Sequence, residues 1–203
     1  MKFRIDLKIL FFLVLFYFTG QLKIYLIIMF FALLHELAHL IVGKILKFRI
    51  TEIEIMPFGL WSSIEPNIDE YKNKNLLEMK KIFISFAGPL LNLIFIKIFL
   101  EIKNDELLYA NLLLIGLNFI PIYPLDGGRI LKCIFRILME KKKADKIINV
   151  IANVFIIILT ICGSIFILYY KNIAILLIIA YLWKLVILEN KRFELKEKIR
   201  NMC

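Results

Sequence analysis

The sequence lacks the features that mark secreted, multidomain or nucleic-acid-binding proteins. Its 3 cysteines, Cys133, Cys162 and Cys203, show no C-x-x-C spacing and therefore do not suggest a disulfide framework. No stretch of about 50 residues has the composition of a soluble domain, which argues against an appended module. The net charge is +10, but no basic stripe with interleaved aromatic residues lies outside the apolar segments, so we expect no nucleic-acid partner.

Hydrophobic residues are abundant instead. They make up 61% of the 203 residues, and the mean hydropathy is +0.81. A soluble domain would be about half apolar, so the excess must face lipid. Six apolar segments follow one another along the chain, at residues 5–20, 22–44, 82–101, 107–123, 147–169 and 173–189. Because several can cross a hydrocarbon core about 30 Å thick, the sequence predicts an all-α polytopic membrane protein with about six transmembrane helices.

The distribution of Lys and Arg predicts the orientation in the membrane. With six alternating helices, 22 of the 27 basic residues fall on the side of the two termini, and only Lys23, Lys103 and Lys171 fall in the segments on the other side. Basic residues accumulate on the cytoplasmic side, so we expect both termini to be cytoplasmic. Residues 1–190 are expected to form one membrane domain, followed by a short charged cytoplasmic tail at residues 191–203.

A short region between the second and third apolar segments has the pattern of β-structure. Residues 51–56 alternate with a period of two, and Pro57 and Gly59 indicate a turn before a second strand at residues 60–64. We therefore predict a small β-hairpin here. The strand at residues 51–55 could bind an unwound substrate segment along its edge; the alternative is that it only packs at the membrane surface.

Residues 35–39 form an H-E-x-x-H motif inside the second apolar segment. On a helix, His35 and His39 lie on one face, so both imidazoles can reach a single zinc ion. Glu36 is close enough to take a proton from a metal-bound water. An ionisable group inside a membrane costs a few kcal/mol unless it is paired or wet, which favours a functional site over three core residues. These are also the only 2 histidines in the chain.

A catalytic zinc has three protein ligands and one open position, so a carboxylate or thiolate must complete the set. Asp126 is the candidate, because the fourth apolar segment returns to the side of the membrane on which His39 lies. The competing interpretation is that Asp126 and the following Gly127 form an ordinary surface turn. Glu52, Glu54 and Cys133 remain as other donors.

Three motifs together resemble the site-2 protease family of intramembrane zinc metalloproteases, peptidase family M50. They are His35-Glu36-x-x-His39, Ala87-Gly88-Pro89-Leu90-x-Asn92 and Asn118-x-x-Pro121-x-x-x-Leu125-Asp126-Gly127. The match covers about residues 30–130 and implies a three-helix catalytic core at about residues 22–130. It implies that His35, His39 and Asp126 bind one zinc ion per chain and that Glu36 is the catalytic base. It also implies that Asn118 lies by the active site, contacting the substrate or stabilising the oxyanion.

Within the family, the sequence is most similar to the sporulation branch, whose members cleave a membrane-associated pro-sigma factor. The resemblance implies an integral protein of the bacterial cell membrane, or of the membrane surrounding the forespore, with its active site toward the cytoplasmic side. Expected partners are a membrane-associated protein substrate, the lipid bilayer and an inhibitory membrane protein. Other branches carry PDZ or CBS domains, and we expect neither here.

Other functions fit parts of the same pattern. A non-catalytic metal-binding membrane scaffold would keep the histidines but would not need Glu36. A cation transporter could use His35 and His39 as a transit site, but such proteins tend to contain paired broken helices and repeated halves. Within the protease class, an anti-sigma factor or a signal-peptide remnant is an alternative substrate.

Overall fold

The computed structural model describes residues 2–56, 59–66, 73–170 and 173–202, which fall into two compact units, Met1–Asn118 and Phe119–Cys203. The first unit contains β1 (Lys2–Ile5), α1 (Lys8–Phe18), α2 (Leu22–Ile45), β2 (Arg49–Met56), β3 (Gly59–Glu65), α3 (Lys74–Ile102) and α4 (Asp105–Asn118). The second contains α5 (Asp126–Leu138), α6 (Lys141–Tyr170) and α7 (Ile173–Met202).

Among the described residues, three helices are long and apolar enough to cross a membrane: α2, α3 and the Lys141–Ile165 part of α6. Only 33% of the most apolar stretch of α2 and of α3, and 22% of that of α6, is buried by protein. The remaining apolar surface needs a non-aqueous environment, as the lipid-facing sides of membrane helices do. The chain is therefore a helical membrane protein.

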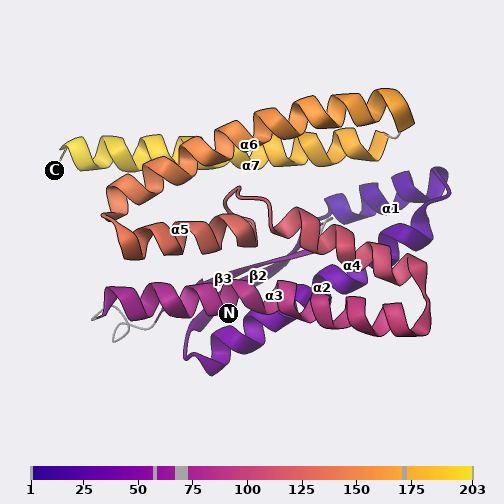
Figure 1. Ribbon diagram of the computed structural model, residues 1–203, viewed down its shortest axis with the longest axis horizontal. Helices are drawn as coiled ribbons and strands as arrows, with labels where there is room; N and C mark the ends of the chain where they lie inside the picture. The colour runs from indigo at the N-terminus through magenta and orange to yellow at the C-terminus, as the bar shows by residue number, and fades with distance from the viewer. Residues whose placement is uncertain (1, 57–58, 67–72, 171–172, 203) are drawn as a thin grey trace. The chain divides into compact units, whose positions relative to one another are not determined.

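The helices of the first unit pack around an aromatic cluster. Phe31 of α2 contacts two rings of α3 edge-on, with centroid distances of 5.1 Å to Phe95 and 5.5 Å to Phe99. Leu108 and Leu114 of α4 join the same cluster. Helices α3 and α4 are joined by a tight turn and lie side by side (Figure 1), and both of them also pack against α2.

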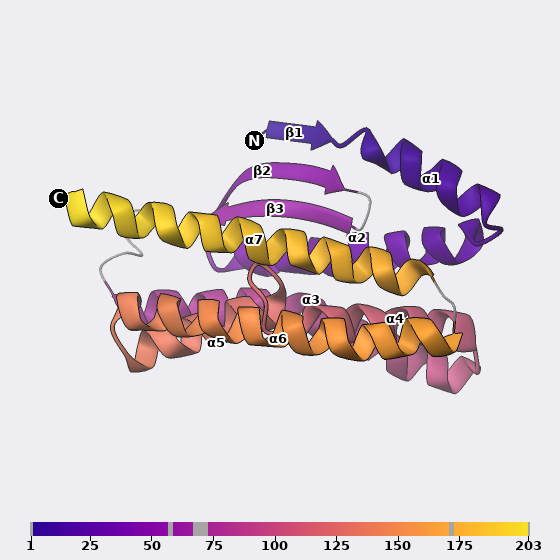
Figure 2. The same ribbon diagram turned by 90° about the horizontal axis from the view of Figure 1, so that it is seen from above.

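The sheet of the first unit has three strands in the order β1-β2-β3 (Figure 2). Strand β2 contains residues 51–55, so the predicted strand is present, and it pairs antiparallel with β3. Its other side pairs in parallel with β1, where Phe3 lies opposite Ile53. The prediction that residues 51–55 offer a free edge is therefore wrong. The reason is that β1 is a four-residue strand distant in sequence, and residues 2–5 give no periodicity of their own.

The second unit is built on two long helices. Helices α6 and α7 run alongside each other in opposite directions (Figure 1) and enclose an apolar cluster that includes Ile156, Leu182 and Val186. Helix α7 continues through Met202 and so includes most of the charged segment at residues 191–203. Helix α5 lies outside the six predicted apolar segments; it is an amphipathic helix that packs on α6.

Candidate metal centre

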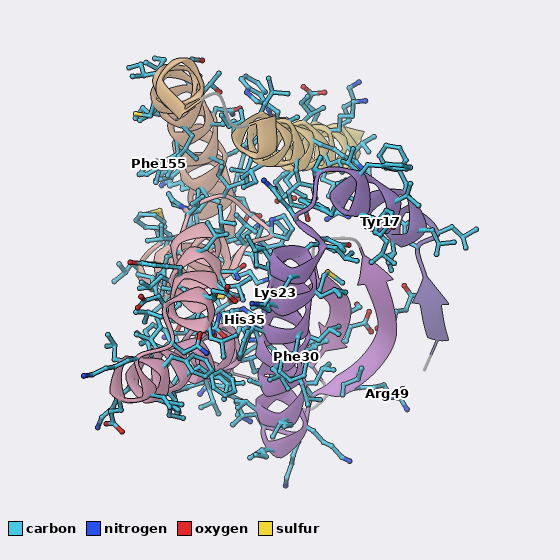
Figure 3. The ribbon with its side chains drawn as sticks, turned by 90° about the vertical axis from the view of Figure 1, so that its right-hand side faces the viewer. Tyr17, Lys23, Phe30, His35, Arg49 and Phe155 are labelled. Carbon is cyan, nitrogen blue, oxygen red and sulfur yellow. The ribbon has the colours of Figure 1, made fainter. Side chains whose placement is uncertain are left out.

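The two histidines lie one turn apart on the same face of α2. His35 is 2% exposed and His39 is fully buried. Their ring centroids are 4.8 Å apart, and the rings are inclined at 82°. Figure 3 shows His35 directed away from α2, toward the side of the unit where α3 packs. The spacing of four residues therefore brings both imidazoles together, as the motif predicts.

One hydrogen bond fixes the orientation of the His39 ring. Its Nδ1 lies 2.6 Å from the backbone carbonyl oxygen of Ile84 on α3. A carbonyl oxygen can only accept a hydrogen bond, so Nδ1 must carry the proton and donate it. The lone pair of this tautomer is therefore on Nε2, which is the atom available to a metal ion.

Gly88 of α3 marks the point at which the two imidazoles converge. A Cβ atom built on Gly88 would lie 2.5 Å from Nε2 of His35 and 2.5 Å from Nε2 of His39. The two Nε2 atoms therefore lie against the same residue of α3 and close to each other. Two imidazole nitrogens converging beside a residue without a side chain fit a borderline-soft divalent cation such as zinc.

The first unit also contains the predicted site residues Glu36 and Asn118. Glu36 follows His35 on α2 and is half-buried, and Asn118 is the half-buried last residue of α4. Asn92 lies four residues after Gly88, on the same face of α3, and is fully buried. Neither polar atom of its side chain has a hydrogen-bond partner within the described part of the chain. Asn92 belongs to the family motif at residues 87–92, and the signal that could single it out is a polar residue within an apolar segment.

Asp126 belongs to the second unit, where it is the first residue of α5 and is 4% exposed. The two residues after it lie against the preceding loop. A Cβ on Gly127 would be 2.3 Å from the carbonyl oxygen of Phe119, and one on Gly128 would be 2.5 Å from the carbonyl carbon of Ile122. Only glycine permits this close approach, so the Asp-Gly-Gly sequence fixes the loop against the start of α5 and thereby sets the position of the Asp126 backbone.

The other predicted donors are distributed over both units. Glu52 lies half-buried on β2, and the backbone of Glu54 follows it on the same strand. Cys133 is buried on α5, about two turns beyond Asp126, and is not in a disulfide within the described residues. Cys162 is likewise not in a disulfide and is exposed on α6, and Cys203 lies outside the described residues.

A pair of converging imidazoles on an apolar, largely lipid-exposed helix defines the class of this chain as a membrane metalloprotein. Comparison with known families then gives the particular family. The profile of peptidase family M50 matches residues 23–102 and 106–162. The chain belongs to peptidase family M50, and the resemblance expected from the three motifs is confirmed.

Two curated proteins are similar in sequence. The chain is 28% identical to Stage IV sporulation protein FB of Bacillus subtilis over 138 residues, which cover 64% of this chain and 46% of that protein. It is 33% identical to Zinc metalloprotease MJ0392 of Methanocaldococcus jannaschii over 113 residues, which cover 50% of this chain and 31% of that protein. The chain thus spans less than half the length of these relatives.

One solved structure has a similar fold. The Site-2 Protease from Methanocaldococcus jannaschii superimposes with a TM-score of 0.66 at 24% sequence identity, over 93% of this chain and 91% of that chain. This likeness establishes the fold and leaves the chemistry to the residues of the site.

Proposed function

We propose that the chain is an intramembrane zinc metalloprotease that hydrolyses a peptide bond in or near a membrane segment of a protein substrate. The observation that carries the proposal is the convergence of His35 Nε2 and His39 Nε2 on one point beside Gly88. Membership of peptidase family M50 supports the same reaction class. Glu36 beside the pair favours catalysis, because metal binding alone would not require it.

We infer that one zinc ion per chain is bound by His35, His39 and Asp126. Two imidazoles and a carboxylate form a common donor set for catalytic zinc. Asp126 is almost completely buried, as His35 and His39 are. The similarity of residues 118–128 to the family motif supports Asp126 over Glu52, Glu54 and Cys133.

Each of the other site residues has a separate role in the proposed reaction. When bound, zinc would polarise the scissile carbonyl and acidify a water molecule. The carboxylate of Glu36 would accept the proton of the attacking water and return it to the leaving amine. The side-chain amide of Asn118 would donate a hydrogen bond to the oxyanion that develops on the scissile carbonyl. The hydrogen bond from His39 to Ile84 would hold one imidazole in the required tautomer throughout.

The membrane arrangement that we propose has six crossings, with both termini and the active site on the cytoplasmic side. Helices α2, α3 and α6 are long enough to cross alone. Helices α1 and α4 have 11 and 14 residues, fewer than the roughly 20 that a full crossing requires, so they would cross with their flanking segments or where the bilayer thins. The bias of 22 basic residues toward one side supports this orientation.

The substrate that we propose is a membrane-associated sporulation pro-sigma factor, because of the similarity to Stage IV sporulation protein FB. Its loosened segment would pair with an outer strand of the sheet, β1 or β3, since β2 is paired on both sides. An anti-sigma factor and a signal-peptide remnant are the alternatives within the same reaction class. An inhibitory membrane protein would restrain the enzyme until it is needed.

The decisive experiment compares the wild type with Glu36→Gln, reconstituted in vesicles with a panel of single-helix substrates. We expect cleavage to fall by about 10²- to 10⁴-fold, while the zinc content is retained, because the variant lacks only the proton acceptor. Glu52→Gln is the matched control and should retain both cleavage and zinc. Unchanged cleavage by Glu36→Gln would contradict the protease proposal and favour the scaffold. Loss of zinc from Glu52→Gln would indicate that Glu52, and not Asp126, is the third zinc ligand.

A further inference from the structure

Helix α5 carries two basic side chains that are buried, although the sequence placed them at a cytoplasmic surface. The side chains of Lys132 and Arg136 are only 8% and 13% exposed. A buried charge is strongly unfavourable unless it is paired and hydrogen-bonded. Their partners therefore show which parts of the chain hold α5, the helix that begins at Asp126, in place.

Lys132 joins three segments of the second unit. Its Nζ donates a hydrogen bond of 2.8 Å to Oε1 of Glu189 on α7, which is 57 residues away in the sequence. The Glu189 side chain is itself only 12% exposed. The same Nζ lies 3.9 Å from the ring centroid of Tyr123, in the loop that leads into α5. One ammonium group thus ties α5 both to α7 and to the loop three residues before Asp126.

Arg136 provides a second tie, to α6. Its Nε and one terminal nitrogen donate hydrogen bonds of 3.0 and 2.7 Å to Oδ1 of Asp145. Lys132, Asp145 and Glu189 border the same small cavity. The four charges balance, so the network is neutral as a whole and each member depends on its partner.

We propose that Lys132 and Glu189 are positioning residues for Asp126, a role that rests on the function proposed above. The ion pair fixes the axial position of α5 against α7, and the contact with Tyr123 fixes the loop that precedes Asp126. Because the pair is buried, its interaction is little screened and has a defined geometry. A metal–ligand distance must lie within about 0.2 Å of its usual value. A shift or tilt of α5 would therefore move the Asp126 carboxylate out of the range for metal binding. Helix α7 thereby supports the metal centre without contributing a ligand to it.

The test measures cobalt(II) binding by the full-length protein in detergent, by competition with a chromophoric chelator, together with the visible absorption spectrum of the bound cobalt. Glu189→Gln keeps the size of the side chain and an acceptor oxygen but removes the charge. We expect it to weaken cobalt binding by about 10- to 100-fold, as loss of a residue that supports a ligand typically does, and to alter the absorption bands. Lys132→Met should behave in the same way.

Compensating variants separate positioning from a general need for these residues. Replacing both partners, as Lys132→Met with Glu189→Leu, leaves no uncompensated charge in the interior but removes the ties from α5 to Glu189 and Tyr123, so cobalt affinity should stay about 10-fold or more below that of the wild type. Lys23→Met is the matched control, because it breaks an ion pair with Glu106 whose side chains are 73% and 57% exposed. Its cobalt affinity should equal that of the wild type.

The outcomes distinguish this inference from the proposed function. Wild-type affinity and spectrum in Glu189→Gln would overturn the positioning role, and so would a double variant that regains the affinity and spectrum of the wild type, because only the cost of an unpaired buried charge would then be at issue. If Lys132→Met does not fold, the milder Glu189→Gln decides the matter. Failure of the wild-type protein to bind cobalt or zinc would instead refute the metal centre itself.

Discussion

Replacing Gly88 by alanine tests the geometry of the candidate metal centre with a single methyl group. The added Cβ would lie 2.5 Å from Nε2 of both His35 and His39, and 2.6 Å from Cδ2 of His35. Ordinary contact begins at 3.4 Å, so both rings would have to retreat by about 0.9 Å. His39 has little freedom to do so, because Nδ1 is hydrogen-bonded to Ile84 at 2.6 Å.

The size of this displacement decides the expected effect. Metal sites tolerate errors of about 0.2 Å in ligand position, so a shift several times larger should reduce zinc affinity by at least about 100-fold. Overpacking of a core by one methyl group costs roughly 1–3 kcal/mol, which need not unfold the protein. We therefore expect Gly88→Ala to retain its helical content and lose both zinc and proteolysis.

Gly116→Ala on α4 is the matched control for this prediction. A Cβ at Gly116 would meet no atom within 4 Å, and alanine favours the helix over glycine by up to about 1 kcal/mol. The assay measures zinc by atomic absorption after purification, circular dichroism for helicity and cleavage of a reconstituted single-helix substrate. Normal zinc content in Gly88→Ala would refute the inference that both Nε2 atoms face a metal beside α3.

Three further predictions concern the metal, the start of α5 and the start of α3. A strong chelator should abolish cleavage and added zinc should restore it; cleavage that survives complete removal of the metal would contradict the mechanism. Gly127→Ala should lower the free energy of unfolding by about 1–3 kcal/mol in thermal denaturation, because its Cβ would lie 2.3 Å from the backbone oxygen of Phe119; an unchanged unfolding temperature would argue against that close approach. Asn73→Ala should destabilise α3 by about 1 kcal/mol and leave zinc content unchanged, because the Asn73 side chain accepts a hydrogen bond of 3.2 Å from the Leu76 amide; loss of zinc would show that this cap also affects the site.

Features set by local sequence could be predicted. The spacing of His35 and His39 alone places them on one face of a helix, and the structure has them 4.8 Å apart between ring centroids. The alternation of residues 51–56 likewise identifies a strand, because successive side chains of a half-buried strand point alternately to the apolar face and to the polar face. The family resemblance depended on motifs of this local kind, which is why it could be stated from the sequence.

Features set by distant partners could not be predicted. Strand β1 exists only because β2 pairs with it, and four residues carry too little periodicity to indicate a strand. The burial of Lys132 depends on Glu189, 57 residues later, so its charge alone suggested a cytoplasmic loop. Gly88 belongs to a family motif, but a glycine is needed there because the His35 and His39 side chains of α2 pack against it. The sequence of α3 alone does not indicate that contact.

The pairing of β1 with β2 has a mechanical consequence for the catalytic helix. Lys2 lies opposite Glu52, so hydrogen bonds join the beginning of the chain to a strand that follows α2. The stretch containing α1 and α2 is thereby closed into a noncovalent ring, tethered at both of its ends to one sheet. A force on that sheet, such as the pull of a captured polypeptide, would be transmitted through both tethers to the helix that carries His35 and His39.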